Sequence, residues 1–99
     1  MIDYKLELPD DFDDYAWEVE SKGWFNGAIF VLGHVRYRLF FYDPTRLSQD
    51  IEDELEGGVA FLERNLLVVK TVDRNNMEKA IEFLAKSGKY IDLKVCDEF

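Results

Sequence analysis

The spacing of apolar residues predicts β-strands in the first part of the chain. Between Ile2 and Leu8 every second residue is apolar, which is typical of a strand with one buried face, and Pro9 ends the pattern. Residues 24–32 form a longer, mostly apolar stretch. Residues 35–42 alternate again, so that one face carries Val35, Tyr37, Leu39 and Phe41 and the other carries Arg36, Arg38, Phe40 and Tyr42.

Two turn signals and one ambiguous segment affect how these strands connect. Asn26-Gly27 and Gly33-His34 are typical of tight turns. Residues 15–20 alternate as in a strand, but the apolar residues of segment 12–21 also have helical spacing and follow a run of acids. Aromatic and β-branched content favours the strand, with a helix as the alternative. We therefore predict a meander of two or three antiparallel strands over residues 15–42.

The middle of the chain predicts a helix followed by a strand. Asp43 and Pro44 are a typical N-cap and first helical residue, and Gly57-Gly58 mark the end of the helix. Its apolar stripe is narrow and consists of Leu47, Ile51 and Leu55. Residues 66–72 are nearly all apolar, which predicts a strand covered on both faces.

A second helix and a last strand complete the predicted fold. The helix begins with Asn75 as N-cap, supported by Glu78, and ends before Gly88. Its predicted buried face consists of Met77, Ala80, Ile81, Leu84 and Ala85. Residues 90–95 alternate as a short strand. The predicted order is β-β-β-β-α-β-α-β: one α+β domain over residues 1–99, with a mixed, mostly antiparallel sheet and two helices packed on one face.

Composition limits the function classes. A chain of 99 residues with 47% apolar residues is long enough for one folded domain. The net charge of −9 argues against binding to nucleic acid or to an anionic membrane surface. The longest apolar run is too short to span a bilayer, the start resembles no secretory signal, and the lone Cys96 forms no internal disulfide. We expect a cytoplasmic protein.

The negative charge is concentrated in two segments. Residues 1–20 contain eight acidic residues against one basic residue, and residues 43–58 contain six against one. Residues 21–42 contain three basic residues and no acidic one. In the first predicted helix Asp50, Asp53 and Glu54 share a face, although like charges at this spacing destabilise a helix. This face is either a solvated, solubilising surface or a site for a basic partner.

Candidate chemistry is sparse. His34 and Cys96 are the only histidine and cysteine, and no serine has the surroundings of a catalytic nucleophile. One His and one Cys do not make a zinc site, and the acidic loop at residues 10–14 lacks the spacing of a calcium loop. The glycine pair follows a helix, whereas a phosphate-binding loop precedes one. We predict no catalytic residue, no metal site and no cofactor.

Two functions fit these observations. The favoured one is a small acidic, non-enzymatic protein-binding module, of the inhibitor or immunity-protein type, that docks a basic partner. The residues proposed for that contact are Asp50, Asp53 and Glu54, with Asp13 and Asp14 from the acidic loop. The alternative is a small-ligand-binding protein or minor enzyme with an aromatic pocket at a homodimer interface. That pocket would use the face with Arg36, Arg38, Phe40 and Tyr42, together with Tyr37 and His34. A third interpretation is that the domain simply forms a homodimer through this aromatic face.

Overall fold

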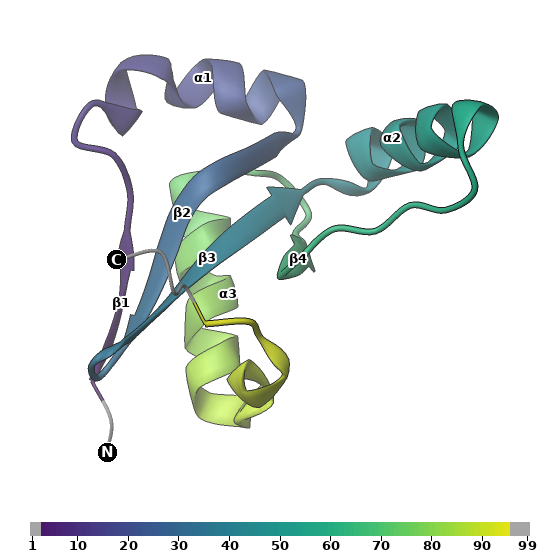
Figure 1. The fold of residues 1–99 in the computed structure, drawn as a ribbon. Helices are drawn as coiled ribbons and strands as arrows, with labels where there is room; N and C mark the ends of the chain where they lie inside the picture. Colours follow the sequence, from purple (N-terminus) through teal and green to yellow (C-terminus); the bar gives the residue numbers. More distant parts are fainter. Residues whose placement is uncertain (1–2, 96–99) are drawn as a thin grey trace.

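Four strands form one mixed sheet in the computed structural model, which describes residues 3–95. The elements are β1 (Tyr4–Glu7), α1 (Phe12–Lys22), β2 (Trp24–Leu32), β3 (Val35–Tyr42), α2 (Pro44–Gly57), β4 (Leu66–Val68), α3 (Arg74–Ser87) and the 3₁₀ helix η1 (Lys89–Asp92). The strand order is β1-β2-β3-β4 (Figure 1). The first three strands are antiparallel, whereas β4 runs parallel to β3. The predicted α+β class is confirmed.

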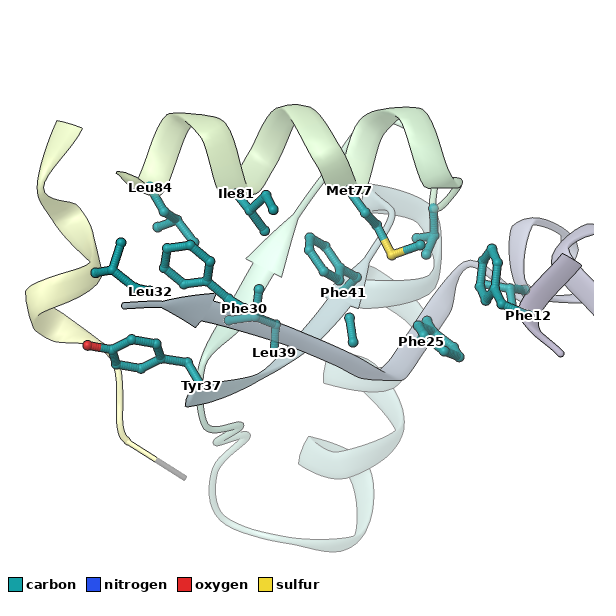
Figure 2. Close-up of a cluster of buried hydrophobic side chains, with 13 residues drawn as sticks. Phe12, Phe25, Phe30, Leu32, Tyr37, Leu39, Phe41, Met77, Ile81 and Leu84 are labelled. Atoms are coloured by element: carbon teal, nitrogen blue, oxygen red, sulfur yellow. The ribbon is translucent and has the colours of Figure 1, made fainter. Parts of the chain in front are cut away.

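Helix α3 covers one face of the sheet and forms the core with it (Figure 2). The helix contributes Met77, Ile81 and Leu84, as its apolar spacing predicts. The facing side of the sheet contributes Phe25, Ala28, Phe30, Leu32, Tyr37, Leu39 and Phe41. Each large apolar side chain that is fully buried in this way contributes about 1.5–3 kcal/mol to stability.

Segment 12–21 is helical, so the prediction of a strand there was wrong. The apolar residues at helical spacing are the ones that pack: Phe12 and Val19 are buried, and the Phe12 ring lies 5.2 Å from that of Phe25. Trp17, whose aromatic ring favoured a strand, is 70% exposed. Gly23 ends the helix at φ 80°, a conformation that other residues rarely adopt. Packing against the sheet therefore outweighs strand propensity here.

Asn26-Gly27 forms a bulge within β2, whereas the sequence signal predicted a turn. Phe25 pairs with Phe41 and Ala28 with Leu39, so that β2 contains one extra residue. The Phe25 ring lies over the backbone at Gly27, where a Cβ would approach the ring carbon Cζ to 2.8 Å. The bulge thus needs glycine at position 27, because a Cβ there would clash with the Phe25 ring. The predicted turn at Gly33-His34 is confirmed as the link between β2 and β3.

The predicted strand at residues 90–95 is replaced by η1 and an irregular segment. Asn65 explains the position of this segment. Its side-chain amide donates to the carbonyl oxygens of Arg38 and Lys94, at 2.9 Å each, and its Oδ1 accepts from the Lys94 amide at 2.7 Å. These side-chain hydrogen bonds hold Lys94 in place without strand pairing. Because Asn65 is distant in the sequence, the periodicity of residues 90–95 does not reveal the contact.

Two further boundaries differ from the prediction. The apolar run at residues 66–72 contains a strand of only three residues, β4, which pairs with β3 alone and is therefore an edge strand. The N-cap of α3 is Asp73, not Asn75, because the Asp73 carboxylate accepts from the Asn76 amide at 2.8 Å.

Helix α2 does not join α3 on the core face, which corrects the predicted arrangement of two helices on one face. Its bounds and its N-cap are as predicted. However, none of its residues is buried, and the helix extends away from the end of β3 (Figure 1). The structure thus has one helix on the core face, one helix at the end of the sheet and one projecting helix.

Candidate interaction surfaces

A projecting arm, which we define as residues 44–65, consists of α2 and the loop that returns to β4 (Figure 1). It contains a continuous exposed stretch, residues 52–60. The start of the arm is set locally. The Asp43 carboxylate accepts from the Arg46 amide at 2.7 Å, and Pro44 already has the backbone angle that a first helical residue needs.

Asp50 attaches the arm to the sheet. Its carboxylate accepts from the Tyr42 hydroxyl at 2.6 Å and from Arg46 Nε at 2.9 Å. Burial, and then the hydrogen bond to the Asp50 carboxylate, raise the pKa of Tyr42 well above its ordinary value. The Phe61 ring also lies edge-on to the Tyr42 ring, at 6.5 Å. Asp50 was predicted as a partner-binding residue, but its carboxylate is already engaged within the chain.

The outer part of the arm combines acidic and apolar side chains. Asp53 and Glu54, both predicted to bind a partner, are exposed on α2, and so are Glu52 and Glu56. The loop that follows presents Val59 at 98% and Leu62 at 92% exposure. These two apolar residues were missed in the sequence, where they lie between a glycine pair and the next strand with no regular spacing.

Asp13 and Asp14 lie in the first turn of α1, far from the arm. Asp13 accepts a hydrogen bond from Arg74 Nη2 at 2.8 Å, so its charge is partly compensated. The other end of α1, next to Asp43, lies beyond a kink at Tyr15 and two further helical turns. The structure therefore does not combine the acidic loop and the acidic helix into one surface.

The second face of the sheet, which we call the open face, carries the residues predicted to share a side with Tyr42. Arg36, Arg38, Phe40 and Tyr42 come from β3, and the register adds Lys5, Glu7, Trp24, Ile29, Val31, Leu66 and Val68. Ile29 and Val31 belong to a central strand yet are only partly buried, and Arg38 is exposed. Their neighbours on the core face, Phe30 and Leu39, are completely buried.

The end of the open face near the arm is aromatic. Phe40 and Tyr42 stack with ring centres 5.0 Å apart and ring planes 8° from parallel. Trp24 extends the row, with its ring centre 5.9 Å from that of Phe40. Such contacts contribute about 0.5–1.5 kcal/mol beyond the burial of the rings. The row therefore serves as a packed platform at the base of the arm.

The opposite end of the open face is positively charged. Glu7 pairs with Arg36 at 2.8 Å and with Lys5 at 3.3 Å. Burial tends to raise the pKa of Glu7, but the hydrogen bonds from Arg36 and Lys5 outweigh it and lower the pKa. Arg38 has no ion pair among residues 3–95. Lys5 and Arg38 are both exposed, so this part of the face presents basic side chains in a chain with a net charge of −9.

The residues of the predicted ligand pocket do not come together. Tyr37 is in the core. His34 lies in the turn before β3 and Tyr42 ends the strand, whose rise from Val35 to Tyr42 is about 23 Å. Two surface hollows of about 190 and 150 Å³ lie elsewhere, one beside α1 and one beside β1. Both are smaller than the 300–1,000 Å³ of ordinary ligand sites.

Residues 3–95 contain no group of three or more His, Cys, Asp or Glu side chains arranged to hold a metal ion. Cys96 lies outside the described residues. No helix within the described range is long and apolar enough to cross a bilayer. Comparison with known protein families, curated proteins and solved structures found no match for this chain.

Proposed function

We propose that this protein is a non-catalytic protein-binding module and that its arm is the docking element. The observation that carries the proposal is the exposure of α2 and its loop. A 14-residue amphipathic helix ordinarily buries its apolar stripe, yet on α2 Leu47 and Ile51 are only half-buried and Leu55 is 50% exposed. Val59 and Leu62 on the loop are almost completely exposed, so they offer a partner two apolar side chains to cover.

The charge of the arm defines the partner. Residues 43–58 contain six acidic residues and one basic residue, so a basic protein surface is the complementary one. Within such a contact, Val59 and Leu62 would enter an apolar pocket, while Asp53 and Glu54 would face Lys and Arg at its rim. An inhibitor or immunity protein of the cytoplasm that covers a basic site on another protein has this chemistry. The single cysteine of the chain agrees with a cytoplasmic location.

Capture experiments test this proposal. The wild-type protein, immobilised and exposed to a lysate of its source organism, is expected to retain a basic protein at low salt and to lose it at high salt. The double variant Asp53→Lys/Glu54→Lys is expected to lose that protein, and Leu62→Asp is expected to weaken its retention. Asp50 is left unchanged because it holds the arm through Tyr42.

A matched control separates the arm from net charge. Glu20 on α1 and Glu78 on α3 are exposed, and reversing both to Lys changes the net charge by the same amount as the arm variant. This control is expected to retain the captured protein. Equal loss in the control and the arm variant would show that the total charge governs capture, and retention by both variants of the arm would place the binding site elsewhere. Either result overturns the proposal.

A further inference from the structure

The arm and the open face each have apolar side chains that are not fully covered, and their neighbouring charges have opposite signs. The arm has an apolar stripe of Leu47, Ile51 and Leu55 that contributes nothing to the core, with acids beside it. The open face has two partly exposed apolar residues, Ile29 and Val31, with basic residues beside them. In one molecule the arm contacts the open face at its Tyr42 end, through Asp50 and Phe61. Helix α2 then extends away from the end of β3 and does not lie along Ile29 and Val31 (Figure 1).

The dimensions of the two surfaces match. A helix of 14 residues is about 21 Å long, and an eight-residue strand such as β3 is about 26 Å long. The helix can therefore lie along the open face over most of its length. The α3 helix, also of 14 residues, already packs on the other face of the same sheet. A second helix of equal length on the open face would give the three-layer arrangement that a sheet with two apolar faces favours.

We infer that the open face is the docking site for the arm of a second copy of this chain. Charge identifies this occupant: the exposed cations Lys5 and Arg38 on the face meet a helix with five acids along its length. Because each copy has both surfaces, a two-fold axis makes both contacts at once. In this dimer Leu47, Ile51 and Leu55 cover Ile29 and Val31, and Arg38 faces the acids of the partner helix.

This dimer goes beyond the proposed function, since it needs no other protein. It also gives the arm a resting position, because an arm on the open face of a second copy is unavailable to a basic partner. The two contacts compete, so separating the copies would release both arms.

Sedimentation of charge-reversed variants tests the dimer. At low salt the wild-type protein is expected to sediment at close to twice its mass of 11.7 kDa. Arg38→Glu changes an exposed residue of the open face, and Asp53→Lys/Glu54→Lys changes the arm. Each variant alone is expected to raise the dimer dissociation constant by about tenfold or more, because each change acts in both symmetric contacts.

Mixing the two variants is the decisive measurement. In a heterodimer the lysine arm of one chain meets the glutamate-bearing face of the other, and the acidic arm meets an unchanged Arg38. An equimolar mixture is therefore expected to dimerise more tightly than either variant alone. The inference is overturned if the wild-type protein is monomeric at every concentration. It is also overturned if Arg38→Glu dimerises like the wild type, or if mixing restores nothing.

The control variant Glu20→Lys/Glu78→Lys should remain dimeric, since both residues lie outside the two surfaces. Circular dichroism spectra that match the wild type show that each variant is folded. Arg38→Glu also separates this inference from the proposed function. Its arm is intact and released, so it should capture a basic partner at least as well as the wild type. Failed capture with an intact dimer would overturn the proposed function alone.

Discussion

Tyr42 joins three parts of the molecule through one side chain. Its backbone belongs to β3, its ring stacks on Phe40, and its hydroxyl donates to Asp50 on α2. A hydrogen bond to a charged acceptor contributes about 1.5–3 kcal/mol. We expect Tyr42→Phe to lower the free energy of unfolding by about 1.5 kcal/mol at pH 7, measured by urea denaturation. A change below about 0.5 kcal/mol would show that Asp50 is held well enough by Arg46 and solvent.

The same residue predicts a pH dependence at alkaline pH. Burial and the Asp50 carboxylate raise the pKa of Tyr42 in the folded protein, so the folded state keeps its phenol proton where the unfolded state loses it. Such a group contributes stability that is present below the unfolded pKa, about 10, and is lost as the pH rises above it. The stability difference between wild type and Tyr42→Phe should therefore shrink above about pH 10. A constant difference from pH 7 to 11 would contradict the raised pKa.

Helices α2 and α3 have the same length, but only α3 contributes side chains to the core. The same substitution, Ile to Ala, should therefore cost more stability in α3 than in α2. Ile81 on α3 is 1% exposed, and truncating it to Ala leaves a cavity, with an expected loss of about 2–5 kcal/mol. Ile51 on α2 lies outside the core. Ile51→Ala should cost less than about 1 kcal/mol in dilute protein, because alanine also favours the helix. Equal losses in urea denaturation would show that α2 is packed as tightly as α3.

The elements also show which features a sequence can predict. The bounds of α2 depend on its own Asp43, Pro44 and glycine pair, and were correct because those signals are local. Segment 12–21 was assigned wrongly because its helix is favoured by contact with Phe25 on another element. The end of the chain depends on Asn65, and only the fold places that side chain beside Lys94.

For the candidate sites too, local features were predictable from the sequence and features that depend on distant contacts were not. Alternation along β3 correctly placed Arg36, Arg38, Phe40 and Tyr42 on one face, since the period of a strand is a local property. Asp50, Asp53 and Glu54 looked equivalent in the sequence, but only Asp50 lies within reach of Tyr42. The projection of the arm was not predictable, because an amphipathic pattern indicates that a helix has an apolar face and does not indicate where that face packs.

At the scale of the whole molecule, charge acts in opposite directions on folding and on association. The net charge of −9 disfavours a compact monomer through self-repulsion, and salt screens that repulsion. Added salt shortens the screening length from about 10 Å at 0.1 M to about 3 Å at 1 M. The free energy of unfolding in urea should therefore rise with NaCl at protein concentrations that favour the monomer. The dimer contact between the arm and the open face should weaken over the same range.

Net charge orders the variants in this experiment. Arg38→Glu replaces one positive charge with a negative one and makes the net charge −11, whereas Glu20→Lys/Glu78→Lys makes it −5. The stabilisation by NaCl should be largest for the first variant, intermediate for the wild type and smallest for the second. A free energy of unfolding that falls with salt would instead mean that ion pairs such as Glu7–Arg36 outweigh the repulsion. Because exposed pairs of this kind contribute little and the acids are in large excess, we expect repulsion to dominate.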